Sequence, residues 1–199
     1  MRILSMKMHI VLLVALFFSA CGLSATKYEV NPGNTAQLTS AEGNLKSKVS
    51  IGEVSKISSR IDMDCRLSTV SFENGENVEN YIKNALINEF KAANIYSESS
   101  DKKLSANIDY INLYSFNPAE LLIPALQSST DAKWSITMTF KGDGFEQFTI
   151  PSIFLFPLRD GFFDFGDPCD NPSKQFSSAV ANLIKILVNH PSFKEFLAK

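Results

Sequence analysis

Alternating apolar and polar residues on both sides of a glycine-rich turn are the feature that most restricts the fold of this 199-residue chain. Apolar side chains occupy every second position from Trp134 to Phe140, the period of a strand with one buried face. Gly142-Asp143-Gly144 follows at once, and glycine supplies the positive φ angles that tight hairpins need. The pattern predicts an antiparallel hairpin that continues into residues 145–150.

Further extended segments are predicted upstream of this hairpin. Residues 48–54 predict a first strand, and residues 61–72 continue the period of two. Alternation resumes at Leu104, and the apolar phase then changes sides at Ile111 and Leu113. Such a change predicts either a β-bulge or a strand buried on both faces.

A helical period of three to four residues begins at Asn77 and continues to residue 93. Asn77 is suited to cap the free amides of this helix. Asn94, followed by Ile95, is suited to a left-handed stop with an apolar contact. The segment therefore predicts one amphipathic helix with a single buried stripe.

A second amphipathic helix is predicted to start near Asp170 or Asn171 and to stop at His190, which precedes a proline. Ser192 and Glu195 predict a capping box for one final turn. Together these elements predict an α+β fold. We expect a two-layer sandwich in which both helices cover one face of a mostly antiparallel sheet of four or five strands.

The N-terminal twenty residues have the order of a targeting segment. Two basic residues precede an uncharged apolar run over 10–18, which is shorter than the roughly 20 residues that a membrane-spanning helix needs. The small residues Ser19 and Ala20 follow this run. Residues 1–20 are therefore predicted to be a signal peptide.

The motif Phe18-Ser19-Ala20-Cys21 resembles the lipobox of bacterial lipoproteins. The resemblance implies that the Cys21 thiol carries diacylglycerol, that residues 1–20 are removed, and that the new N-terminus is acylated. Several acyl chains give a stable membrane anchor. Gly22, where an aspartate would signal retention in the inner membrane, implies an outer-membrane protein that faces the periplasm. An ordinary signal peptide that leaves Cys21 as a free thiol is the alternative.

The segment after the lipobox is rich in glycine, serine, threonine and asparagine. Residues 21–46 are therefore predicted to be the lipidated cysteine and a flexible tether, whose roughly 25 residues could span about 80 Å. Residues 47–199 are predicted to form one periplasmic domain. The alternative is that residues 27–31 add an edge strand to the sheet.

Cys65 and Cys169 remain after Cys21 is assigned to the anchor. An even number of cysteines in an oxidising compartment predicts a structural disulfide. The alternative is a reactive or metal-binding pair, but the chain has no C-x-x-C spacing, and His190 is the only histidine outside the signal peptide. We therefore expect Cys65 to pair with Cys169.

Charge and motifs exclude several classes of function. The formal net charge of −2 lacks the basic footprint of a nucleic-acid-binding protein. No catalytic motif is present, and His190 has no evident orienting partner. The four aspartates within residues 160–170 do not follow the EF-hand pattern. The sequence therefore predicts a protein without catalytic residues, metal or cofactor.

Two apolar stretches, residues 117–126 and 150–170, are candidate binding surfaces, because exposed apolar patches mark interaction sites. The candidate partner or ligand residues are Leu121, Leu122, Leu126, Phe154, Phe156, Phe162, Phe163 and Phe165. For the second stretch, the alternative is a buried strand followed by a loop that Cys169 fastens to the core.

The lipobox, the small α+β domain and the lack of catalytic residues resemble small accessory lipoproteins of the Gram-negative envelope, such as auxiliary lipoproteins of ABC-type transport systems. The resemblance implies an adaptor or binding role in transport or envelope assembly. We expect a membrane-anchored protein that binds an envelope protein or an apolar ligand. An activator of cell-wall synthesis, an unrecognised hydrolase and a surface-displayed antigen are the alternatives.

Overall fold

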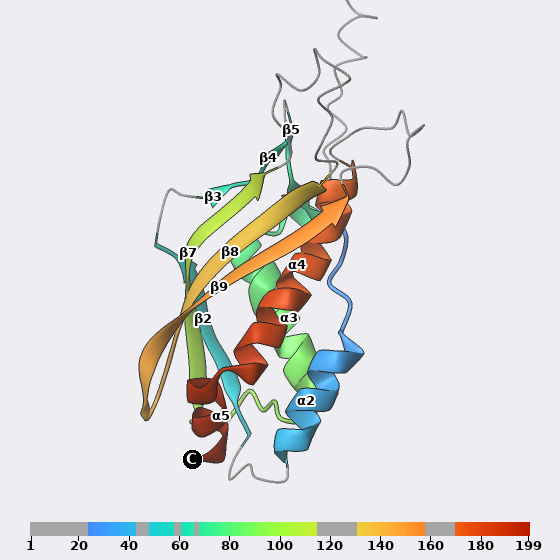
Figure 1. Cartoon of the computed structure of the whole chain (residues 1–199). Coiled ribbons are helices and arrows are strands. Elements are labelled where there is room, and N and C mark those ends of the chain that lie inside the picture. The colour runs from blue at the N-terminus through green and yellow to red at the C-terminus, as the bar shows by residue number, and fades with distance from the viewer. Residues whose placement is uncertain (1–23, 43–47, 58–60, 66–67, 115–130, 158–169) are drawn as a thin grey trace, which may run out of the picture.

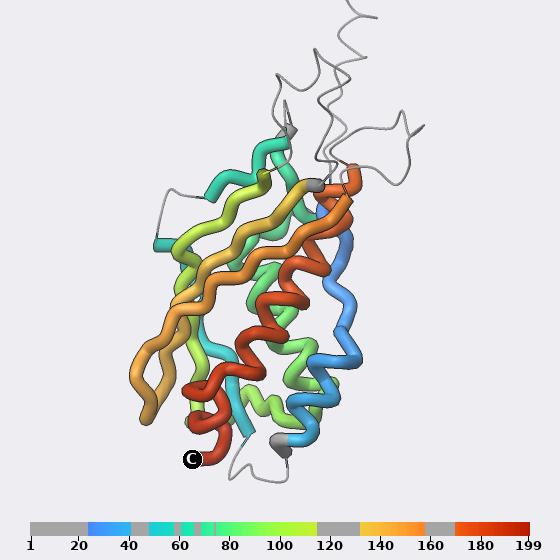
Figure 2. Tube along the Cα trace, viewed as in Figure 1, coloured from blue at the N-terminus to red at the C-terminus, as the bar shows by residue number. Residues whose placement is uncertain are grey.

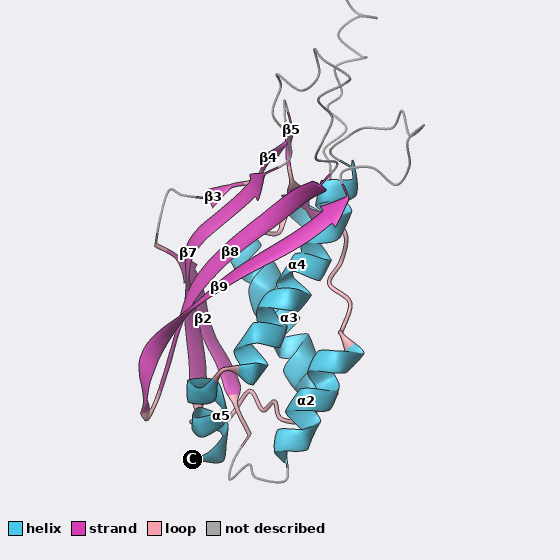
Figure 3. Cartoon of the chain, in the orientation of Figure 1, coloured by secondary structure: helices cyan, strands magenta, loops and turns pink. Residues whose placement is uncertain are grey.

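The computed structural model describes residues 24–42, 48–57, 61–65, 68–114, 131–157 and 170–199. In this part of the chain, helices gather on one face of a five-stranded sheet, so the α+β prediction is confirmed (Figures 1 and 3). The sheet order is β2-β7-β8-β9, and β3 also pairs with β7. Two smaller sheets, β1-β6 and β4-β5, have two strands each.

The five-stranded sheet consists of β2 (Ser50–Lys56), β3 (Ile61–Asp62), β7 (Lys103–Tyr114), β8 (Asp131–Gly142) and β9 (Phe145–Pro157). The short strands are β1 (Ser24–Ala25), β4 (Asp64–Cys65), β5 (Ser68–Thr69) and β6 (Ser71–Phe72). The helices are α2 (Pro32–Glu42), α3 (Val78–Ala92), α4 (Asp170–Asn189) and α5 (Pro191–Ala198), with a 3-10 turn over Glu73–Gly75.

The sheet is mixed rather than mostly antiparallel. β7, β8 and β9 are antiparallel neighbours, but β2 and β3 run parallel to β7. The physical reason is the crossover through α3, which returns the chain to the sheet in its original direction. The helical layer also differs from the prediction, because α2 and α5 join α3 and α4.

The predicted hairpin is confirmed by the antiparallel pairing of β8 and β9. Gly142 pairs in register with Phe145, and Gly144 has the positive φ of 82° that the turn requires. The predicted change of phase in β7 is a bulge, because the register with β8 shifts between Ile108 and Tyr110. Both local patterns therefore indicated the correct backbone geometry.

The predicted ends of α3 are also confirmed. The Asn77 side chain accepts a hydrogen bond from the Asn80 amide at 2.8 Å, and Asn94 has a left-handed φ of 59°. α4 ends before His190, as predicted. The capping box at Ser192 is wrong, because α5 begins at Pro191 and His190 is its N-cap, consistent with the preference of proline for the first helical turn.

Most large apolar side chains are buried between the sheet and the helices. Phe176 of α4 packs edge-on against Trp134 of β8, with ring centroids 4.9 Å apart, and Phe72 and Tyr81 extend this aromatic cluster. The indole nitrogen of Trp134 donates to the Pro172 carbonyl at 2.9 Å. The cluster holds the N-terminal part of α4 against the sheet.

Residues 24–42 pack against the helices, so the prediction of a flexible tether is wrong for this part of residues 21–46. Figure 2 shows this segment in blue beside α4. Leu38 and Ala25 are each 1% exposed, and the Asn34 amide group donates to the Ala181 carbonyl at 2.9 Å. Local composition predicted a tether, but these few residues find partners on distant parts of the chain.

Candidate functional site

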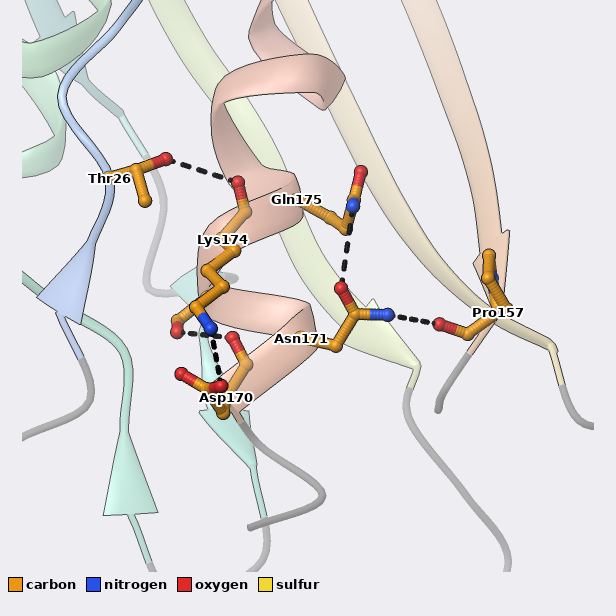
Figure 4. A network of polar contacts seen from close by, with 7 residues as sticks. Thr26, Pro157, Asp170, Asn171, Lys174 and Gln175 are labelled. Carbon is orange, nitrogen blue, oxygen red and sulfur yellow. Dashed lines mark hydrogen bonds and ion pairs between the residues drawn. The ribbon is translucent and has the colours of Figure 1, made fainter. Parts of the chain in front are cut away.

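One end of the domain joins β1, the start of α4 and the end of β9 (Figure 4). Thr26 donates through its hydroxyl to the Lys174 carbonyl at 3.2 Å. At the other side of α4, the Asn171 amide group donates to the Pro157 carbonyl at 2.5 Å. We call this end of the domain, where the described chain begins at Ser24, the entry end.

The first turn of α4 is stabilised locally as well. The Lys174 ammonium lies 2.6 Å from the Asp170 carboxylate, four residues earlier. Both side chains are more than half exposed, so this ion pair contributes little stability. The Gln175 amide group donates to the Asn171 side-chain oxygen at 3.3 Å, which helps to orient Asn171 toward β9.

The end of β7 and the start of β8 also lie at the entry end. Asp131 pairs in register with Pro157, and Lys133 pairs with Tyr114. The described residues next to both predicted binding stretches therefore lie at the same end of the domain as the first described residues of the chain (Figure 1). This arrangement brings together three parts of the sequence that are far apart along the chain.

Most of the predicted site residues lie outside the described residues. They are Cys21, Leu121, Leu122, Leu126, Phe162, Phe163, Phe165 and Cys169. Cys65 lies in β4 and is 1% exposed. The predicted pairing of Cys65 with Cys169 stays a prediction.

Two predicted binding residues, Phe154 and Phe156, point toward the helical side of β9. Phe156 is 4% exposed and belongs to the core, which fits the alternative of a buried strand. Phe154 is half-buried, and its ring lies 6.2 Å from that of Phe156. Phe154 also lines a shallow groove between α4 and residues 29–34, beside Ala181 and Lys185.

Sequence reasoning did not single out the exposed face of the sheet. Tyr114, Ile153 and Leu155 are 52%, 61% and 65% exposed there, on the side opposite the helices. Register places Tyr114, Lys133 and Leu155 in one row across three strands, and the Lys133 ammonium lies 5.2 Å from the Tyr114 ring centroid. We call Tyr114, Lys133, Ile153 and Leu155 the outer-face patch. No sequence signal separates Ile153 and Leu155 from the core, because residues 153–156 are all apolar.

The free edge of β9 is poorly suited to accept another strand. Pro151 and Pro157 have no amide hydrogen to offer a partner. The Asn182 amide group donates to the Ile153 carbonyl at 3.3 Å and to the Ser152 hydroxyl at 3.0 Å. These features block continued pairing along the edge, so a partner is expected to bind through side chains rather than by strand addition.

No group of three or more histidine, cysteine or acidic residues within the described ranges could hold a metal ion. The His190 ring stacks on Phe148 with centroids 4.2 Å apart, and its Nδ1 atom accepts from the Ser192 amide at 3.3 Å. His190 therefore has a structural role at the junction of α4 and α5.

Tyr28, within the N-terminal segment, and Tyr81, whose hydroxyl donates to the Thr26 carbonyl, both have raised pKa values. Burial raises the pKa of Tyr81 to about 12. Burial, and then the hydrogen bond to Glu89, raise the pKa of Tyr28 above its ordinary value. Both phenols stay protonated near neutral pH and act as hydrogen-bond donors.

No protein-family model matches the sequence, and comparison with characterised proteins finds no relative. Among the described helices, none is both long enough and apolar enough to cross a membrane. The function of the entry end and of the outer-face patch is therefore inferred from the contacts, exposure and charge of their residues.

Proposed function

We propose that this chain is a lipid-anchored accessory protein of the Gram-negative envelope, held by Cys21 in the outer membrane and facing the periplasm. In this proposal it has no catalytic role, and it binds an envelope protein or an apolar ligand at its entry end. The lipobox and the two apolar stretches of the sequence support the proposal.

The arrangement at the entry end is the observation that carries this proposal. Tyr114 and Asp131 bound the segment that contains Leu121 and Leu122, and Asp131 pairs with Pro157. Pro157 in turn precedes the segment that contains the phenylalanine pair 162–163 and accepts a hydrogen bond from α4. The described residues that flank residues 115–130 and 158–169 therefore lie at the same end of the domain as Thr26, the end that the proposed anchor would hold.

The competing hypothesis is that the side chains of both stretches are buried in the core, because large apolar side chains usually are. Phe156 follows that rule, whereas Ile153 and Leu155 do not. Exposed apolar residues at this end favour binding over purely structural packing.

Cross-linking in intact cells tests the proposed binding role. The full chain is purified from envelopes after mild cross-linking, and the attached molecules are identified by mass spectrometry. We expect one defined envelope protein or one apolar ligand, and we expect the double variant F162S/F163S to lose it. Ile57→Ser is the matched control, because it removes an exposed apolar side chain that directly follows β2 instead.

The anchor is tested separately on the N-terminal peptide of the mature protein. We expect its mass to include a diacylglyceryl group and an acyl chain on Cys21. An unmodified Cys21 would contradict the anchoring proposal. Equal recovery of the same molecule with wild type and with F162S/F163S would contradict binding through residues 158–169.

A further inference from the structure

We infer that the entry end lies directly against the bilayer and that the outer-face patch contacts the lipid surface. This inference rests on the proposed lipidation of Cys21 and adds an orientation to it. The partner of the outer-face patch in this inference is the membrane, contacted at the level of the lipid headgroups, and it is distinct from the protein or ligand proposed for residues 158–169. A long tether, in contrast, would leave the orientation of the domain free.

The length of chain between anchor and domain is the first argument. Ser24 lies only three residues after Cys21, and an extended chain covers about 3.3–3.6 Å per residue. The anchor can therefore hold Ser24 no farther than roughly 10 Å from the lipid surface. The 80 Å reach that the sequence alone suggested is excluded by the folding of residues 24–42.

The attachment of this segment to the body of the domain is the second argument. Ser24 pairs with Ser71, and Ala25 is 1% exposed. The Tyr81 hydroxyl donates to the Thr26 carbonyl at 2.7 Å, and Thr26 itself donates to Lys174. These contacts, made by β6, α3 and α4, hold the first described residues firmly against the body of the domain.

The position of the exposed apolar side chains is the third argument. The pair of Lys133 and Leu155 is two residues from the terminal pair of Asp131 and Pro157, or about 7 Å along the strands. Farther along the same face, Thr139 and Thr149 face each other and share a hydrogen bond of 2.7 Å. Large exposed apolar side chains on this face therefore concentrate near the entry end.

The chemistry of the outer-face patch suits a membrane interface. Ile153 and Leu155 are apolar side chains that gain by leaving water. Tyr114 combines an aromatic ring with a polar tip, which favours the headgroup region. Lys133 can keep its ammonium in water while its methylene groups lie against lipid.

Acidic groups at the same end limit how much anionic lipid could strengthen the contact between the patch and the membrane. Asp62 pairs in register with Asn112, next to the patch, and Asp64 follows in β4. These carboxylates would repel anionic lipid. The contact should therefore form on zwitterionic phosphatidylcholine and should not require anionic headgroups.

Site-specific fluorescence on the full lipidated chain tests this orientation. The protein is purified from membranes and reconstituted into phosphatidylcholine vesicles as Leu155→Cys and, separately, as Gln147→Cys, each labelled with an environment-sensitive dye. Gln147 is the matched control, because it is exposed on the same face of β9. The two positions are eight residues apart, roughly 26 Å along the strand. Unsubstituted protein reports any labelling of native cysteines, and thermal unfolding checks that both variants fold.

We expect the dye at position 155 to shift to the blue and to be quenched by lipids that carry a nitroxide near the headgroup. The dye at position 147 should behave as it does in water. Equal behaviour at both positions, with lipid on Cys21 established by mass, would overturn the orientation and leave the anchoring proposal intact. A shielded dye at position 155 that nitroxide lipids do not quench would also overturn it, because a protein would then cover the patch. An unmodified Cys21 would overturn both.

Discussion

Tyr28 donates a hydrogen bond of 2.5 Å to the carboxylate of Glu89, a residue 61 positions later that is completely buried in α3. The same oxygen accepts from the Asn31 amide at 2.7 Å, and the second oxygen accepts from the Thr35 hydroxyl at 3.2 Å. A buried carboxylate is costly unless donors surround it. Glu89 is therefore the buried polar contact that fastens residues 28–35 of the N-terminal segment to α3.

Tyr28→Phe should loosen this attachment without creating a large cavity. Removing one hydrogen bond to a charged group costs about 1.5–3 kcal/mol of unfolding free energy. Urea unfolding measures that loss, and limited proteolysis should cut residues 24–42 sooner than in wild type. Tyr114→Phe is the matched control, and because Tyr114 is half-exposed its change should stay within about 0.5 kcal/mol. An equal loss in both variants would contradict the role of Glu89.

Alkaline pH should weaken the fold through Tyr81. Its pKa is raised from 10.0 to about 12 in the folded state, because burial disfavours the phenolate. The resulting stability is fully present below pH 10.0 and is lost as the pH rises toward about 12. Unfolding free energy measured across this range should fall less steeply in Tyr81→Phe than in wild type. Parallel curves for the two proteins would contradict this prediction.

Gly52→Ala should destabilise the pairing of β2 with β7. A Cβ atom at this position would lie 2.2 Å from the Ser105 hydroxyl and 2.9 Å from the Lys103 side chain. Relieving such overpacking typically costs about 1–3 kcal/mol. Chemical denaturation should show this loss, and the double variant G52A/S105A should recover part of it, since the nearest atom is then absent. No recovery would show that the Ser105 hydroxyl is not the limiting contact.

The predicted disulfide can be tested by reduction. A bond between Cys65 and Cys169 would close a loop of about 100 residues and contribute roughly 4–5 kcal/mol in the chain-entropy model. Cys169 directly precedes α4, so reduction should also free the first turn of that helix. We expect a lower melting temperature under reducing conditions. An unchanged melting temperature, with both thiols labelled in the native protein, would exclude the bond.

Local signals account for the parts of the fold that the sequence predicted well. Gly144 has the positive φ of the hairpin turn, and Asn77 and Asn94 form the ends of α3. Each depends on a residue type and its near neighbours, because caps and turns are satisfied within a few positions. The capping box predicted at Ser192 was wrong for a local reason as well, because His190, two residues earlier, caps α5 instead.

The candidate site was much less accessible to such reasoning. The sequence pattern places Phe154 and Phe156 in one apolar stretch with Ile153 and Leu155, yet Ile153 and Leu155 are exposed, whereas Phe156 is buried and Phe154 is half-buried. An apolar run shows that a segment is hydrophobic, but the pairing of its strand decides which side chains face the helices. Register with β8 was therefore needed to define the outer-face patch.

By itself, the sequence determined the period of each strand and helix, the turns and caps between them, and the lipobox that predicts an anchor at Cys21. Only the tertiary structure decided that residues 24–42 dock through Glu89 and Asn34 and that β2 runs parallel to β7. It also decided that Thr26 shares one end of the domain with Tyr114 and Pro157. The physical reason is the range of the interactions. Local backbone preferences depend on neighbouring residues, whereas burial of Glu89 or pairing of distant strands depends on partners that only the folded chain brings together.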